Sequence, residues 1–185
     1  MATRLRADAE RNRAALLAAA RQIFGEQGLD ASLDEIARRA GVGNATLYRR
    51  FPTRRDLIAE VFAGQMTEYV ELADLALHEP DPWAAFVGYL TRLFELQATD
   101  RGLSELLVST SFDGDERLSA LRAAAQRGAS EVIVRAQQAG VLRADFTRKD
   151  LSILMRANAG VVQASLDPNA WKRQLVLLLD GLARR

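Results

Sequence analysis

Helix start and stop signals punctuate this chain along its whole length, and they leave little room for a sheet. Apolar residues recur three and four positions apart, whereas the alternation of a half-buried strand is nearly absent. Gly28 follows a long helical stripe, where glycine commonly ends a helix. Asp81-Pro82 and Asp167-Pro168 each offer an Asp N-cap with proline at the first helical position. The sequence therefore predicts an all-α fold.

The same signals predict about nine helices in two parts. Ser32 with Glu35, and Thr53 with Asp56, have the three-residue spacing of helix N-terminal caps. We expect an N-terminal domain over residues 1–52 and a larger domain over 53–185, which meet at a helix junction rather than a tether. The expected helices span residues 8–27, 32–39, 44–51, 54–77, 82–97, 102–110, 116–139, 148–166 and 168–183.

Composition removes several classes of protein. The chain has 185 residues, 49% of them hydrophobic, which is enough for a substantial core. It has no cysteine, so disulfides and thiolate metal sites are excluded. No run of about 18 uninterrupted apolar residues occurs, and the N-terminus lacks a long apolar segment, so we expect a cytoplasmic protein.

Charge is distributed unevenly although the net charge is only +1. Residues 1–55 carry eleven arginines against six acidic residues, a net +5, whereas the remaining residues carry −4. A basic first third on a mildly acidic remainder favours an anionic partner for the N-terminal part. A solvated charged surface would give the same count.

The segment GVGNATLYRRFPTR, residues 41–54, explains that asymmetry best. Two short helices joined by a tight turn that contains glycine form a helix-turn-helix. Gly41 suits the left-handed conformation at the end of the first helix. In the second helix Leu47 and Phe51 are spaced to face the core, which leaves a small, polar and basic outer face. Such a face suits the major groove of DNA, where it meets phosphates and base edges.

The stretch AALLAAARQIFGEQGLDASLDEIARRAGVGNATLYRRFPTRRDLIAEVF, residues 14–62, resembles the DNA-binding domain of the tetracycline-repressor (TetR) family of bacterial transcriptional regulators. The matching marks include Phe24 before Gly28, the AGV turn at 40–42 and TLY at 46–48. The resemblance implies a dimeric, all-helical, sequence-specific DNA-binding regulator with an effector-binding second domain. We expect a repressor that a small molecule releases; an activator or a ligand-independent DNA-binding protein of the same fold is the alternative.

The resemblance also assigns the DNA-contacting residues. The recognition helix maps onto residues 43–50, and Gly43 is among the DNA-binding positions. The family often has a serine there that caps the helix and touches phosphate, so in this chain that contact is either lost or replaced by backbone or by Asn44. The partner implied is a near-palindromic operator in double-stranded DNA. The residues expected to contact bases are Asn44, Ala45, Thr46 and Arg49, and those expected to contact phosphates are Ser32, Tyr48, Arg50 and Arg54.

The sequence gives less support to other functions. The only histidine, His78, ends a helix, where a helix-dipole role suits it better than catalysis. The acidic run at 113–116 lacks the spaced ligands of a calcium loop. We therefore expect no enzyme, no metal and no cofactor. A packaging protein that binds DNA without sequence preference would not need the acidic, aromatic-rich second domain.

That second domain is expected to hold the effector and the dimer interface. Small residues on a second face of the 148–166 helix predict dimerisation through 148–166 and 168–183. Asn158 continues an apolar face, so it needs a partner: a ligand, another side chain or the same helix across a dimer. We expect an uncharged or weakly polar ligand, held by Phe86, Leu90, Phe94, Phe112, Met155 and Asn158.

Overall fold

A computed structural model describes residues 2–109 and 115–184 of the chain. Within these ranges the protein is all α-helical, and its one β-type contact is an isolated bridge between Leu142 and Ala183. The helices are α1 (Ala2–Gln27), α2 (Leu33–Arg39), α3 (Asn44–Arg50), α4 (Arg54–His78), α5 (Pro82–Thr99), α6 (Arg101–Val108), α7 (Glu116–Gln138), α8 (Arg148–Ala164) and α9 (Ala170–Leu182).

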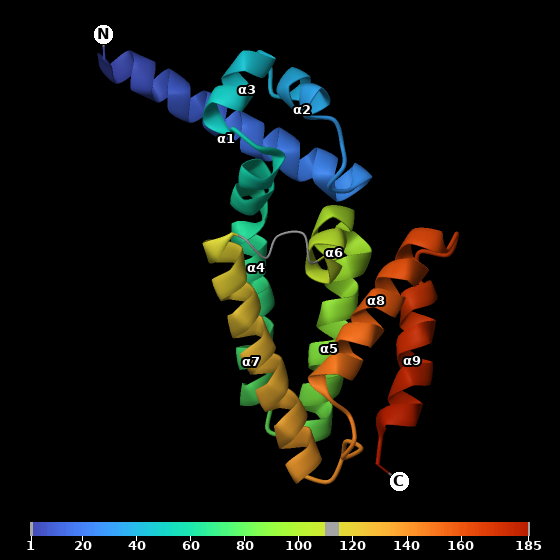
Figure 1. Cartoon of the computed structure of the whole chain (residues 1–185). Coiled ribbons are helices and arrows are strands. Elements are labelled where there is room, and N and C mark those ends of the chain that lie inside the picture. The colour runs from blue at the N-terminus through green and yellow to red at the C-terminus, as the bar shows by residue number, and fades with distance from the viewer. Residues whose placement is uncertain (1, 110–114, 185) are drawn as a thin grey trace.

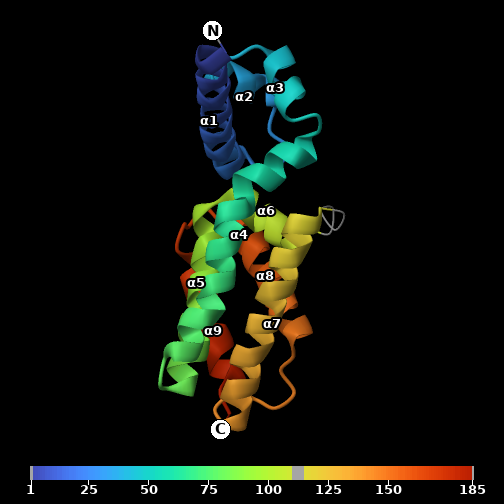
Figure 2. The same cartoon turned by 90° about the vertical axis from the view of Figure 1, so that its left-hand side faces the viewer.

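The helices form two regions that α4 connects. Helices α1, α2 and α3 make a head at one end of the molecule, and α5 to α9 make an elongated body (Figure 1). Figure 2 shows α4 running from the head down the length of the body, beside α7. In the body, α8 packs against α9 on the side away from α4 (Figure 1). The architecture places the head and the body on one continuous helix.

Two apolar cores correspond to these regions. The head core buries Leu16, Ile23 and Phe24 of α1 against α2, α3, the first half of α4, and α6. The body core contains Phe86, Leu90 and Phe94 of α5, together with side chains of α7, α8 and α9. Tyr69 and Leu107 are partly buried and pack against both cores, so the two are continuous.

Most helix ends form as the sequence predicts. Gly28, directly after α1, and Gly140, just beyond the C-cap residue Ala139 of α7, take positive φ angles of 90° and 71°. Thr53 accepts a hydrogen bond from the backbone of Asp56, whose carboxylate bonds back to Thr53, a complete capping box. Asp81 caps α5 through the backbone N–H groups of the next residues, with proline at the first position.

Two predicted helix starts are wrong. Helix α1 begins at Ala2, not near residue 8. Helix α9 begins at Ala170 rather than Pro168, because Asp167 and the two residues after it form a turn. The Asp167 carboxylate accepts the N–H of Asn169 at 2.8 Å, and its carbonyl accepts the N–H of Ala170 at 3.1 Å. Asp167 therefore initiates a turn, and Asn169 occupies the N-cap position without a side-chain cap.

Helix α6 forms a second connection between body and head. Gly102 lies so close to α1 that an added Cβ would sit 2.7 Å from the Phe24 carbonyl oxygen and 2.7 Å from the Phe62 ring. The Glu105 carboxylate accepts the backbone N–H of Leu29, in the loop after α1, at 2.7 Å. The head is thus held to the body both by α4 and by the close packing of α6 against α1.

Candidate functional site

The turn before α3 has the geometry that the sequence predicts. Gly41 has a φ of 68°, the left-handed region that favours glycine, and the backbone N–H of Val42 returns to the Ala37 carbonyl at 3.0 Å. Leu47 and Phe51 are 1% and 5% exposed, so the inner face of α3 is locked into the head core. The orientation of α3 is therefore fixed by packing on one side.

The opposite face of α3 lies in solvent. Tyr48 is 48% exposed, so it is not a packed core tyrosine. Small and polar side chains surround it, which permits close approach of another molecule's backbone. The residues of this face are Asn44, Ala45, Tyr48, Arg49 and Arg50, all exposed, with Thr46 partly exposed.

Positive charge on this face is not neutralised within the protein. Elsewhere in the head, arginines are engaged: Arg39 lies 3.6 Å from the Glu26 carboxylate, and Arg54 bonds to loop carbonyls. The guanidinium groups of Arg49 and Arg50, by contrast, make no hydrogen bond or ion pair with any residue of 8–109 or 115–184, the ranges whose side chains the structure describes. The outer face of α3 therefore presents two free guanidinium groups, which suit phosphates or the guanine edge.

The start of α3 departs from the usual helix start. Gly43 is its N-cap, with extended φ and ψ of −74° and 151°, and no side chain caps the helix there. Asn44 does not take over as cap: its amide donates to the Asp34 carboxylate at 2.7 Å. That bond ties α3 to α2 and orients the amide on the outer face.

Two residues that the sequence assigns to phosphate contacts also make hydrogen bonds within the head. The Arg54 guanidinium donates to the carbonyls of Leu29 and Ala31 at 2.8 and 2.5 Å, which pins the loop between α1 and α2 to the start of α4. The exposed Ser32 caps α2 by accepting the Glu35 N–H at 3.4 Å. Sequence reasoning did not find the Arg54 bonds, because they depend on which carbonyls the fold brings near.

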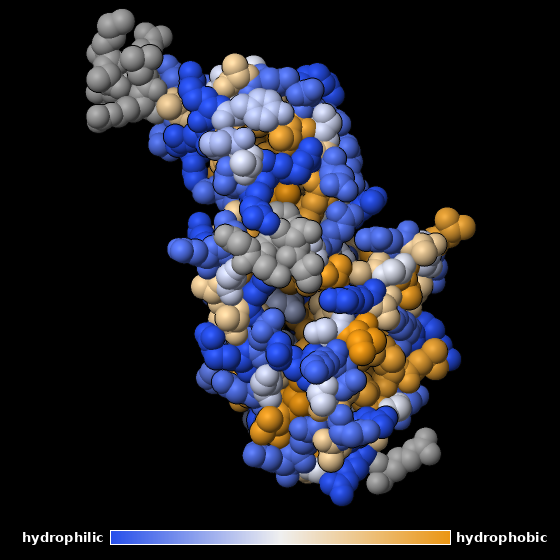
Figure 3. Space-filling view, in the orientation of Figure 1, coloured by the Kyte–Doolittle hydropathy of each residue, from blue (hydrophilic) through white to orange (hydrophobic). Residues whose placement is uncertain are grey.

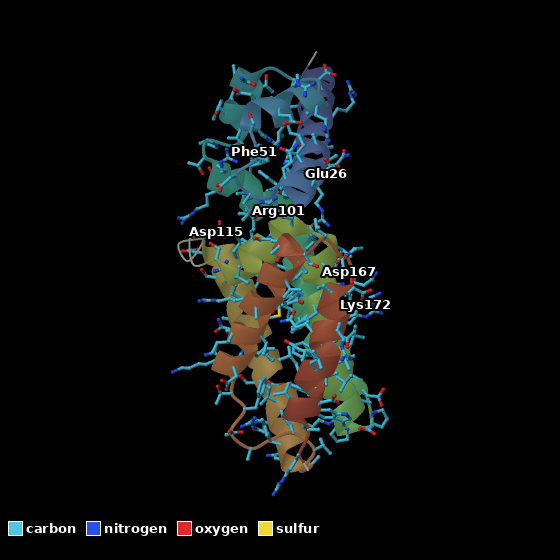
Figure 4. The ribbon with its side chains drawn as sticks, turned by 90° about the vertical axis from the view of Figure 1, so that its right-hand side faces the viewer. Glu26, Phe51, Arg101, Asp115, Asp167 and Lys172 are labelled. Carbon is cyan, nitrogen blue, oxygen red and sulfur yellow. The ribbon has the colours of Figure 1, made fainter. Side chains whose placement is uncertain are left out.

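A second candidate site is a hollow of about 470 Å³ in the body. Its walls come from α4, α6, α7 and α8, below the junction with the head that Arg101 marks in Figure 4. Buried apolar side chains line its interior, among them Met66, Leu151 and Met155. Tyr69 adds a phenol, whose pKa burial raises to about 12, so it is protonated and can donate a hydrogen bond.

The ligand residues predicted from sequence do not, with one exception, line this hollow. Met155 does, whereas Phe86, Leu90 and Phe94 are fully buried within the body core. Phe86 packs edge-on against Phe146 with ring centroids 5.8 Å apart. Helical periodicity identified the buried face of α5 correctly, but that face meets other side chains rather than a space. Phe112 lies outside the described residues.

The buried amide of Asn158 finds its partner inside the protein. Its Nδ2 donates to the Gln97 side-chain oxygen at 2.9 Å, and both residues are fully buried between α8 and α5. Of the three partners that the sequence left open, the structure thus supplies another side chain. Asn158 does not line the hollow.

The hollow carries charge, whereas the sequence predicted a site for an uncharged or weakly polar ligand. Arg135 lies outside it and donates to four carbonyls around the end of α4, including that of Glu79 at 2.5 Å. Three other arginines line the hollow: Arg122, Arg148 and Arg156. The sequence signal that would have found two of them is the spacing of 148, 152 and 156 along one face of α8.

Features of rival functions are weak in the described part of the chain. His78 is exposed, and its ring Nδ1 lies 2.7 Å from the Asp74 carbonyl in the last turns of α4. Within residues 2–109 and 115–184, no group of three or more side chains is arranged to hold a metal ion. None of the helices described combines the length and hydropathy needed to cross a membrane. The predicted acidic loop at 113–116 falls partly outside the described residues.

Comparison with known proteins covers both regions. Residues 16–61 match the model of the bacterial regulatory proteins of the tetR family, and residues 81–184 match the C-terminal domain of SbtR-like transcriptional regulators. A TetR transcriptional regulator from Streptomyces coelicolor is 32% identical, with 93% of this chain and 98% of that chain covered and a TM-score of 0.60.

Two further relatives are similar along most of their length. A TetR regulatory protein from Mycobacterium vanbaalenii is 33% identical, with 97% of this chain and 99% of that chain covered and a TM-score of 0.58. An uncharacterized HTH-type transcriptional regulator of Mycobacterium tuberculosis is 27% identical over 180 residues, covering 90% of this chain and 91% of its own length.

Proposed function

Because the chain belongs to the tetR family of bacterial regulatory proteins, we propose that it acts as a homodimeric repressor released by a small molecule. Family membership makes it a DNA-binding transcriptional regulator. The observation that supports release by a small molecule is that α4 contributes side chains to both the head and the body. Its Leu57 and Phe62 are fully buried in the head core, while Met66 and Tyr69 line the hollow in the body.

DNA recognition is assigned to the outer face of α3. A helix fixed by Leu47 and Phe51 and bearing free arginines can enter a major groove, where its N-terminal residues meet base edges. We assign Asn44 and Arg49, with Ala45 and Thr46, to bases. Backbone phosphates are assigned to Tyr48, Arg50, Ser32, the Gly43 backbone and the start of α4 at Arg54, where N–H groups favour anions.

Substitutions on α3 test this assignment. Asn44→Ala and Arg49→Ala should each cost about 1–3 kcal/mol on the preferred site and relax sequence preference. Arg50→Ala should weaken binding to all sequences alike and reduce the slope of log affinity against log salt by about one unit. Arg127→Ala, an exposed arginine on α7, is the charge-matched control and should change neither property. Equal loss of specificity from all four substitutions would contradict the assignment.

A homodimer through α8 and α9 would present two copies of α3 to one operator. Apolar side chains gather over these helices (Figure 3), and Ile153 and Leu177 are 62% and 56% exposed in the single chain. On α8 the exposed small residues Ala157, Gly160 and Ala164 permit close helix approach. Two protomers related by a two-fold axis match a near-palindromic site with half-sites about one helical turn apart.

Gly160 gives a clean test of the dimer. A Cβ added there meets no atom within 4 Å in the single chain, so Gly160→Arg should leave the protomer folded. Sedimentation at micromolar concentration should show a dimer for the parent chain and a monomer for this variant. The control is Gly88→Arg on α5, also exposed and free of neighbours within 4 Å. A folded parent chain that sediments as a monomer would refute the dimer.

The direction of regulation is tested with a reporter gene placed behind the DNA upstream of this gene. A repressor lowers expression, and Arg49→Ala restores it. An activator of the same fold would do the opposite, and a ligand-independent DNA-binding protein would not respond to any effector. The expected result is repression that a ligand of the hollow relieves.

A further inference from the structure

The charge of the hollow has one sign. Among the residues that the structure describes, its lining contains three arginines and no aspartate or glutamate. Residues 56–185 as a whole carry more acidic than basic side chains, a net −4. The composition of the body therefore does not account for a hollow whose described charged side chains are all arginines, and the fold has gathered them there.

The three arginines differ in whether their side chains are already bonded to other groups of the protein. Arg122 donates to the Leu106 carbonyl at 2.7 Å, so it helps to hold α7 against α6. Arg148 and Arg156 are exposed, and their guanidinium groups make no hydrogen bond or ion pair with any described residue. They lie eight residues apart on α8, about 12 Å along the axis, with Ser152 between them on the same face.

The nearest acid on α8 does not neutralise Arg148. Asp150 is held in the capping box of the helix, where it accepts from the Thr147 N–H at 2.7 Å and the Thr147 hydroxyl at 2.6 Å. These hydrogen bonds hold the pKa of Asp150 below its usual value, so its charge stays at the helix start. Asp150 does not line the hollow.

The interior of the hollow is apolar. Met66, Leu151 and Met155 are at most 6% exposed, and two alanines of α7, Ala125 and Ala129, complete the floor. The volume of about 470 Å³ lies within the usual range for small-molecule sites, about 300–1,000 Å³. An apolar floor with cations at its edge is complementary to a molecule that has an apolar body and an acidic end.

We infer that the hollow binds a small amphipathic anion, whose carboxylate or phosphate is held by Arg148 and Arg156 and whose apolar body rests against Met66, Leu151 and Met155. The inference rests on the proposed function and names the chemical class of its effector. The Tyr69 hydroxyl, on the α4 wall, can donate to an oxygen of the ligand. Ligand binding thereby acts on α4, the helix that also anchors the head.

Calorimetry on the full chain tests the inference with matched probes. Octanoate and octyl phosphate carry the two kinds of acidic group, and 2-naphthoate offers an aromatic body. Octanamide and 2-naphthamide are the uncharged counterparts. At least one acid should bind at least tenfold more tightly than its amide. The better of octanoate and octyl phosphate identifies the acidic group.

Substitutions locate the site. Arg148→Gln and Arg156→Gln should each weaken binding of the acid about tenfold or more, because each removes a charge-assisted hydrogen bond to the acidic group. Neither should weaken the amide. Arg127→Gln removes an equivalent charge on α7 outside the hollow and should have no effect. Amides that bind as tightly as acids, acids that ignore both substitutions, or no acid that binds at millimolar concentration would each overturn the inference.

DNA-binding measurements on the same proteins distinguish a failure of this inference from a failure of the proposed function. Affinity for the DNA upstream of the gene is measured by fluorescence anisotropy with and without the bound acid. The acid should lower DNA affinity, typically 5–150-fold, and DNA should lower acid affinity by the same factor. Specific DNA binding without acid binding would refute only the inference. Acid binding by a chain that binds no specific DNA would refute the proposed function.

Discussion

Gly102 is the position where a single methyl group tests the connection between head and body. In Gly102→Ala the new Cβ would lie 2.7 Å from the Phe24 carbonyl oxygen and 2.7 Å from the Phe62 ring. Ordinary contact begins near 3.4 Å, so α6 must move away from α1 by several tenths of an ångström. Neither neighbour yields easily, because one is helix backbone and the other is a fully buried ring.

The magnitude follows from two opposing effects. Overpacking of this kind costs about 1–3 kcal/mol, and immobile neighbours favour the upper half of that range. Alanine in place of a helical glycine returns about 0.5–1 kcal/mol. We expect Gly102→Ala to lose about 1–2.5 kcal/mol of unfolding free energy, which is roughly 2–10 °C in Tm for a chain of this size.

Gly88→Ala on α5 is the matched control. It is also a helical glycine, but a Cβ there meets nothing within 4 Å, so only the favourable effect applies and stability should rise by about 0.5–1 kcal/mol. Urea unfolding followed by circular dichroism at one fixed protein concentration compares the two. If Gly102→Ala is as stabilising as Gly88→Ala, then α6 does not pack this closely against α1.

Two further predictions concern single polar features. Gly43→Ser adds a hydroxyl at the uncapped start of α3, where the backbone is extended and a Cβ has open space; head stability should rise by a few tenths of a kcal/mol, as measured by urea unfolding. Asn158→Ala leaves the buried Gln97 side-chain oxygen without its donor and should lower the unfolding free energy by about 1–3 kcal/mol. The double variant Asn158→Leu with Gln97→Leu should lose less, and a double-mutant cycle measures the difference directly.

Local chemistry made most of the fold predictable from the sequence. Thr53 with Asp56, Asp81 with its proline, and the glycines after α1 and α7 all form the ends that their spacing predicts. The buried inner face and exposed outer face of α3 likewise follow from helical periodicity. The start of α9 was mispredicted, because Asp167 can cap either a helix or a turn and its neighbours form the turn.

Long-range geometry explains what the sequence did not reveal. Periodicity shows that Phe94 and Met155 face inward, but not that the first meets side chains and the second a hollow. Charge counts likewise do not distinguish Arg54, which is bonded to loop carbonyls, from Arg49, which is free. Such distinctions depend on which helices pack together, and a single sequence carries little information on that.

A DNA-binding titration of the full chain decides whether α3 reads a specific operator. Fluorescence anisotropy compares the duplex upstream of this gene with a scrambled duplex of equal length at one salt concentration. We expect two protomers per site and an affinity for the upstream duplex at least about 10³-fold higher than for the scrambled one, and Arg49→Ala should remove most of that preference. Equal affinity for both duplexes, or a preference that survives Arg49→Ala unchanged, would contradict the claim that α3 reads a specific operator.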